Sequence, residues 1–301
     1  MARHRLIFLV ACVIAVGLAG DLPSTAQTGA EIGFEARSLQ PGELVVLTIT
    51  FASEPTSVRV TAFGRSLPSF RLREHVWRAL GGIDLEQPTG PATVEVEAQT
   101  AQGVVRARRD LDVLPKRFEV RTLKVAPDFV NPPASVQSRI LADTAFLKAL
   151  YSSSAPEPLW HIPFVRPVPG EANSSFGTRS RFNGELRSPH SGTDFLSGAG
   201  TPIKAPNAGR VVAARDLYFS GNTVIIDHGQ EMFSMLAHLS RIDVREQDRV
   251  EAGQIVGLVG ATGRVTGPHL HWALRIAGAR VDPLSALALL GSDATGHSQG
   301  R

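Results

Sequence analysis

The segment Thr266-Gly267-Pro268-His269-Leu270-His271-Trp272 decides how the second half of this chain is interpreted. His269 and His271 stand two positions apart in a run of β-type sequence. Side chains at positions i and i+2 share one face of a strand, so both imidazoles point the same way. Two imidazoles on one face of a strand favour a metal site.

A second pair of ligand-type residues lies upstream, in Ser188-Pro189-His190-Ser191-Gly192-Thr193-Asp194. His190 and Asp194 are four apart, but Gly192 and Thr193 interrupt a helix, so we expect a turn that enters a strand. His238 follows the apolar run Met235-Leu236-Ala237 and, taken alone, is more often a structural residue. His228, between Asp227 and Gly229, is interpreted as a structural residue of a hairpin turn.

Five of the nine histidines in the chain fall between positions 190 and 271, together with Asp194. Zinc binds neutral imidazole and carboxylate groups, and a catalytic zinc site has three protein ligands and one open position. This set can supply two histidines and one aspartate as ligands and leave two histidines for proton transfer. The sequence contains neither an HExxH motif nor a GxSxG nucleophile elbow.

From Pro163 to Leu284 the sequence resembles the lysostaphin/LytM-type zinc metallopeptidase domain, whose landmarks are HxxxD and HxH. The resemblance extends to Ser175–Arg179, Gly200–Ala205 and Gly253–Gly257. The part ahead of Pro163 is similar, through weaker motifs, to the accessory region of secreted bacterial members.

The resemblance implies roles for five residues. His190, Asp194 and His271 match the three metal ligands of the family, which predicts one Zn²⁺ per chain. His269 matches the general base that acts on the attacking water. His238 matches a second catalytic histidine, which orients that water and stabilises the oxyanion. The substrates implied are the peptide cross-links and stem peptides of bacterial peptidoglycan.

One position departs from the commonest family pattern. Many members have Tyr two residues before the middle histidine, where this chain has Leu236. A tyrosine hydroxyl would add a hydrogen bond, whereas leucine would only pack.

The composition and the N-terminal segment predict the class of protein and its cellular location. With 43% hydrophobic and 20% charged residues and a net charge of +3, the chain is globular and has no basic run that predicts nucleic-acid binding. A basic start and the apolar run Leu6–Ala19 predict a signal peptide over residues 1–26, with an uncleaved anchor as the alternative. The only cysteine in the sequence, Cys12, lies in this apolar run. We therefore expect secretion, no stable membrane insertion after signal removal and a periplasmic location, with an extracellular one as the alternative.

The pattern of short strands and turns predicts a mainly β protein: a sandwich-like N-terminal domain, a connecting helix and an antiparallel peptidase sheet. The expected boundaries are 28–118 for the sandwich, 119–158 for the connecting segment, 159–290 for the zinc peptidase and 291–301 for a disordered tail. Within the connecting segment, Ser135 is expected to cap a helix at about 135–151. Asp282, followed by Pro283, is expected to cap a short helix.

Two function classes compete. The first is an active zinc endopeptidase that cuts peptidoglycan peptides. The second is a catalytically inactive LytM-type module that binds and activates a cell-wall amidase, but such modules have lost zinc ligands. A binding sandwich protein would explain only the first half of the chain. We also expect the N-terminal half to pack near the zinc cleft, limiting access or positioning a glycan strand, with a non-contacting spacer as the alternative.

Overall fold

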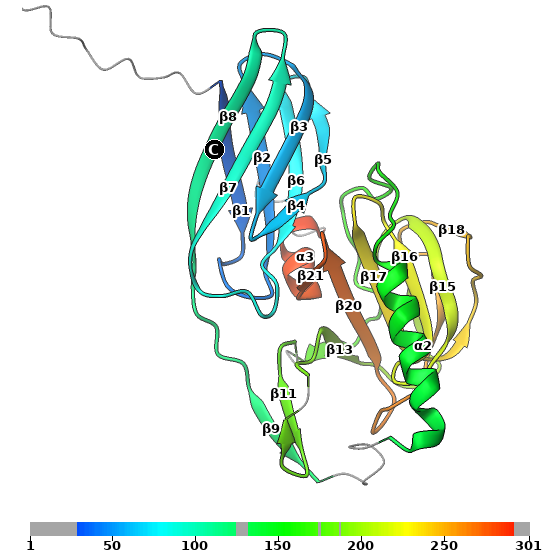
Figure 1. Ribbon diagram of the computed structural model, residues 1–301. Helices are drawn as coiled ribbons and strands as arrows, with labels where there is room; N and C mark the ends of the chain where they lie inside the picture. Colours follow the sequence, from blue (N-terminus) through cyan, green and yellow to red (C-terminus); the bar gives the residue numbers. More distant parts are fainter. Residues whose placement is uncertain (1–28, 125–131, 174–175, 187, 292–301) are drawn as a thin grey trace, which may run out of the picture.

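A computed structural model of the chain describes residues 29–124, 132–173, 176–186 and 188–291 (Figure 1). The predicted signal peptide and all of the predicted tail except Gly291 lie outside these ranges. The fold is mainly β, as the sequence predicted. The first half contains strands β1 (Ala30–Ala36), β2 (Leu44–Phe51), β3 (Pro55–Ala62), β4 (Arg65–Leu67), β5 (Ser69–Arg73), β6 (Val76–Gly82), β7 (Gly90–Thr100), β8 (Gly103–Val113) and β9 (Val120–Leu123).

Two four-stranded antiparallel sheets form the N-terminal sandwich, in the orders β1-β2-β6-β5 and β4-β3-β7-β8. They share one hydrophobic core, to which β2 contributes Leu47 and Ile49 and β7 contributes Val94 and Val96. Runs of β-forming residues, two of them alternating, predicted β2, β3, β7 and β8. Strands β1, β4, β5 and β6 were not predicted.

The second half is built around a ten-stranded sheet, whose main path runs β10-β13-β20-β17-β16-β15-β18. Strand β19 joins it by pairing with β17 and β14, and β21 pairs with β20. The ten strands are β10 (Glu171–Asn173), β13 (Gly192–Leu196), β14 (Pro202–Lys204), β15 (Gly209–Leu217), β16 (Gly221–Asp227), β17 (Met232–Ile242), β18 (Arg249–Val250), β19 (Ile255–Val259), β20 (Leu270–Ile276) and β21 (Ala279–Val281). Strands β11 (Arg179–Phe182) and β12 (Glu185–Leu186) form a separate sheet with β9. Leu236, the position that departs from the family pattern, is completely buried in this half's core.

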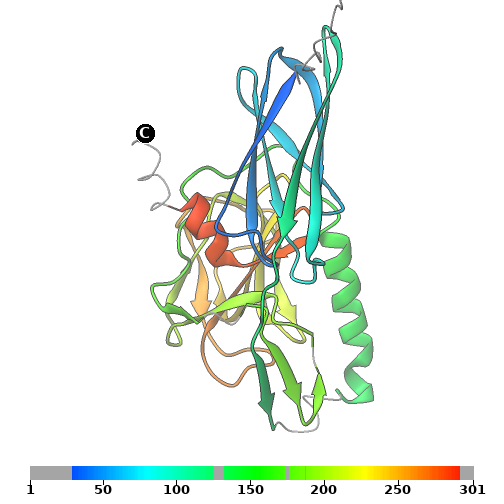
Figure 2. The same ribbon diagram turned by 90° about the vertical axis from the view of Figure 1, so that its left-hand side faces the viewer.

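Helix α2 (Ala134–Leu150) packs beside β15, β16 and β17, along the side of the molecule in Figure 2. The prediction that Ser135 caps it was wrong. Pro133 occupies the N-cap position with extended dihedral angles and no side-chain cap, and Ser135 lies inside the first turn. In contrast, α3 (Pro283–Leu290) begins as predicted, because the Asp282 side chain accepts a hydrogen bond from the Leu284 N–H.

The sandwich contacts the peptidase half directly, which contradicts the non-contacting spacer alternative. Leu44, Val46 and Leu80 of the sandwich share a buried cluster with residues of β20, β21 and α3, and α3 lies directly below the sandwich in Figure 1. Ion pairs cross the same interface from Arg37 to Asp282 and from Arg280 to Asp84. Whether this contact limits access or positions substrate stays a prediction, as do the domain boundaries.

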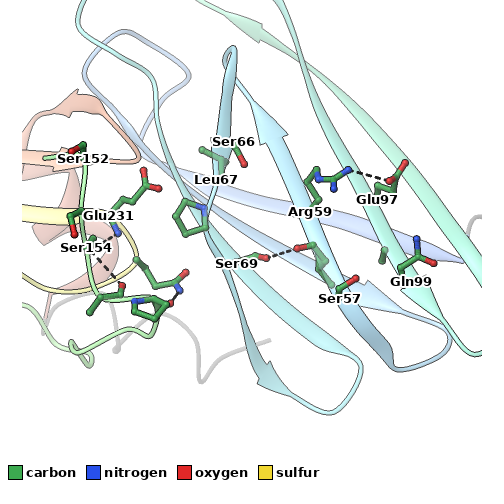
Figure 3. A pocket seen from close by; sticks show the side chains of 17 residues that line it. Ser57, Arg59, Ser66, Leu67, Ser69, Glu97, Gln99, Ser152, Ser154 and Glu231 are labelled. Carbon is green, nitrogen blue, oxygen red and sulfur yellow. Dashed lines mark hydrogen bonds and ion pairs between the residues drawn. The ribbon is translucent and has the colours of Figure 1, made fainter. Parts of the chain in front are cut away.

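The connecting segment also pairs with the peptidase half. Strand β9 runs parallel to β11, which forms a hairpin with β12. A polar cavity of about 680 Å³ lies elsewhere, between the sandwich and the segment after α2 (Figure 3). It contains none of the predicted site residues. Among the described residues, no helix has the length and apolar character needed to cross a membrane.

Candidate metal centre

Two adjacent antiparallel strands bring Asp194 and His271 together. Asp194 on β13 stands directly opposite His271 on β20. His190 lies just before β13, and its backbone N–H donates to the Thr178 carbonyl while its own carbonyl accepts from the Gly177 N–H. His190 thus leads into β13 from irregular backbone bonded to residues 177 and 178, where the sequence predicted a turn, and its imidazole lies against the strand pair.

The three side chains place their ligand-type atoms together. His190 Nε2 lies 2.9 Å from His271 Nδ1. Asp194 Oδ1 lies 3.0 Å from His271 Nδ1 and 3.2 Å from His190 Nε2. A tetrahedral zinc ion with bonds of about 2.0–2.1 Å separates its ligand atoms by about 3.3 Å. The spacing and the two-imidazole, one-carboxylate donor set therefore fit a metal ion held by these residues.

The electrostatics of this cluster favour the ionised carboxylate and neutral imidazole. Burial opposes the charge on Asp194, but hydrogen bonds from His190 and His271 hold the pKa of this carboxyl well below its usual range. Burial lowers the pKa of His271, although Asp194 partly opposes that effect. A carboxylate and a neutral imidazole are the forms that bind zinc.

The two other predicted histidines lie beside the cluster. His269 Nε2 is 3.7 Å from Asp194 Oδ1, and the rings of His238 and His269 have centroids 5.0 Å apart. His269 Nδ1 lies 2.9 Å from the Gly267 carbonyl, and His238 Nδ1 lies 2.9 Å from the Thr262 carbonyl. Because a carbonyl only accepts, each Nδ1 carries the proton and donates, which leaves Nε2 as the free base in the neutral ring.

His238 is held in a special backbone conformation. Its φ angle is +69°, which is uncommon for a residue with a side chain, and its N–H donates to the Ser220 carbonyl. Burial and the neighbouring histidines lower the pKa of His238 to about 4. The imidazole is therefore neutral at pH 7.

His228 lies outside the cluster, as expected for a structural residue. It is completely buried, with Nδ1 2.7 Å from the Ala208 carbonyl and Nε2 2.9 Å from Ser234 Oγ. Trp272 Nε1 donates to the same Ser234 oxygen. His228 lies in the hairpin connection between β16 and β17, as the sequence predicted, and its buried ring fixes the back of the sheet behind the site.

Sequence reasoning missed the residues that hold the site from behind. Thr193 is completely buried, and its hydroxyl donates to Asp282 Oδ1 at 3.0 Å. Gly192 leaves no room for a side chain, because a Cβ there would lie 2.6 Å from His271 Cε1. The glycine inside the HxxxD motif was the only sequence signal for this close approach.

Comparisons with known proteins agree with this geometry. A model described as Peptidase family M23 matches residues 188–283, which hold all five site positions. A Pseudomonas aeruginosa protein whose crystal structure carries the designation peptidase M23 aligns with a TM-score of 0.64 at 34% identity, over 83% of this chain and 95% of that one. The fold and the site together define the metallopeptidase class. The chain belongs to peptidase family M23, as the resemblance indicated.

Two curated relatives each match about a third of this chain. The peptidoglycan DD-endopeptidase ShyA of Vibrio cholerae serotype O1 is 45% identical over 98 residues, which are 33% of this chain and 23% of the relative. The DD-carboxypeptidase/endopeptidase Mpg of Neisseria meningitidis serogroup B is 40% identical over 96 residues, 32% of this chain and 22% of the relative. The matched part spans less than a quarter of these relatives' length.

Proposed function

We propose that this protein is a secreted, zinc-dependent endopeptidase that hydrolyses peptide bonds in peptidoglycan stem peptides or cross-links. The observation that carries the proposal is the convergence of His190 Nε2, Asp194 Oδ1 and His271 Nδ1 within 4.8 Å of one another, with two further imidazoles beside them. His190, Asp194 and His271 would hold one Zn²⁺ per chain. When bound, that ion lowers the pKa of a coordinated water and polarises the scissile carbonyl.

His269 is assigned the proton transfer. Its Nδ1–H is fixed by the Gly267 carbonyl, so the unprotonated Nε2 faces the region beside Asp194. Nε2 accepts a proton from the attacking water and returns it to the leaving amine. Imidazole is suited to both steps because its protonation changes close to neutral pH.

His238 is assigned to orient the water. The neutral ring donates from Nδ1 to Thr262, so Nε2 can accept a hydrogen bond from the water but cannot donate one. Stabilising an oxyanion would require a proton on Nε2, which the lowered pKa of the buried ring disfavours. The structure therefore favours the water-orienting part of the predicted role over the oxyanion part.

The substrate class rests on the relatives. ShyA and Mpg are named for endopeptidase activity, and ShyA specifically for peptidoglycan; they are 45% and 40% identical to this chain over 98 and 96 residues. The signal-like N-terminus supports action after export, in the periplasm or outside the cell. The amidase-activator alternative receives no support, because the chain has lost none of the three ligand positions.

Mass spectrometry of the products tests this proposal. Purified peptidoglycan sacculi are treated with the mature protein, and the released muropeptides are identified. Cleavage of a peptide bond, seen as a new amino terminus and a new carboxyl terminus with intact glycosidic bonds, is expected from the wild type. His269→Ala should release about 10²–10⁴-fold less per unit time, since general acid–base groups typically contribute that factor. Release of glycan fragments alone, or of nothing, would refute the proposal.

A further inference from the structure

Thr193 connects the metal centre to the N-terminal sandwich. It directly precedes Asp194 on β13, and alternation along the strand turns its side chain to the opposite face. There the hydroxyl donates to Asp282 Oδ1 at 3.0 Å, and the Thr193 side chain is completely buried. The backbone that carries Asp194 is thus bonded on its hidden side to the cap of α3.

Asp282 is in turn held by the sandwich. Its other oxygen, Oδ2, accepts from Arg37 Nη2 at 2.9 Å, and its N–H donates to the Gly42 carbonyl at 2.7 Å. Arg37 also binds both oxygens of Glu43, at 2.8 and 2.9 Å. The Glu43 side chain is only 3% exposed and that of Asp282 only 10%. The nearly buried Asp282 therefore takes its compensating charge from the Arg37 guanidinium, whereas Glu43 is also paired with Lys116 Nζ at 3.2 Å.

A buried charge left without its partner forces nearby structure to rearrange. If Arg37 were lost, Asp282 would shift toward water, and its bond to Thr193 would break or carry β13 with it. Groups behind the ligands of a metal set the orientation of those ligands, and their loss typically costs about 10–100-fold in metal affinity. The Arg280–Asp84 ion pair also crosses the interface, but it lies on β21 rather than on β13.

We propose that Arg37 of the sandwich is a positioning residue for the metal centre, and that it acts through Asp282 and Thr193 on Asp194. The sandwich is then part of the metal-binding unit rather than an adaptor. The family model begins at residue 188, so this contribution comes from outside the matched segment. The inference rests on the proposed zinc site.

Zinc affinity tests the inference without relying on activity. The full mature chain and its variants are stripped of metal and titrated with zinc in competition with a chromophoric chelator. Thr193→Val keeps the shape of the side chain but removes the hydroxyl, and Arg37→Met removes the charge. Each should weaken zinc binding about tenfold or more. Thr193→Ser retains the hydroxyl and should bind zinc as the wild type does.

Two controls separate positioning from general damage. Arg280→Met disrupts the same interface at Asp84 and should leave zinc affinity within about twofold, which is the scatter expected of independent sites. The double variant Arg37→Met/Thr193→Val should be no weaker than the more affected single variant, because both changes break one chain of contacts. Circular dichroism establishes that each variant is folded. If Arg37→Met does not fold, the comparison of Thr193→Val with Thr193→Ser tests the inference.

The outcomes distinguish the two proposals. Zinc binding by the wild type with unchanged affinity in Thr193→Val, or an equal loss in Thr193→Ser or Arg280→Met, would overturn this inference alone. A wild-type chain that binds no zinc would overturn the proposed function, and this inference with it.

Discussion

His228 makes the stability of this protein depend on pH through a single buried ring. In the neutral ring, Nδ1 donates to the Ala208 carbonyl and Nε2 accepts from the Ser234 hydroxyl, and the ring is completely buried. Burial lowers the pKa of His228 from 6.5 to about 4. The unfolded chain therefore takes up the proton first, and stability is lost as pH falls from the unfolded pKa toward the folded one.

The size of the effect follows from the two pKa values. One pKa unit corresponds to about 1.4 kcal/mol, so lowering the pH from about 7.5 to about 5 should reduce the free energy of unfolding by about 2 kcal/mol through this residue. His228→Gln should be less stable at neutral pH because it cannot span both partners. However, its free energy of unfolding should not show the loss of about 2 kcal/mol that His228 causes between these pH values.

Urea unfolding of the metal-free wild type and His228→Gln at both pH values measures the difference. Contributions from other groups, including His238, are common to the two chains and cancel. Equal pH dependence in both chains would refute the conclusion that His228 is held neutral by its surroundings.

Three further changes probe the site and the interface. His271→Ala should lose both zinc and activity, whereas His269→Ala should keep zinc; equal metal contents, measured by atomic absorption, would contradict the division into ligand and base. Gly192→Ala should weaken zinc binding, because its Cβ would contact the His271 ring at 2.6 Å; an unchanged dissociation constant would show that the ring can move without cost. A chain that begins near Trp160 should unfold at a lower temperature and cleave sacculi more slowly, since it loses the sandwich side chains that cover α3 and β20. Faster cleavage would instead show that the N-terminal half restrains the site.

The candidate site could be predicted from the sequence because its residues are placed by local backbone geometry. Two histidines at i and i+2 share a strand face, and glycine between His190 and Asp194 excludes a helix. The fold class followed from the strand and turn patterns. Asp282 with Pro283 predicted the start of α3 because cap and first-turn chemistry are also local.

The remaining features depend on contacts between distant parts of the chain. Arg37 and Asp282 are 245 positions apart, and neither carries a local signal of its partner. Ser135 was chosen as a helix cap on side-chain chemistry alone, but the N-cap of α2 is the extended Pro133, two positions earlier. His228 could be recognised as structural, whereas its bond to Ser234 required the pairing of strands.

Zinc titration of the metal-free protein, followed by its activity on sacculi, tests the central claim most directly. Activity should be absent without metal, rise in proportion to added zinc and level off at about one equivalent per chain, as expected for a site with three protein ligands. His190→Ala should show no such rise. Full activity in the chelated protein, or zinc binding that restores no cleavage, would contradict the account.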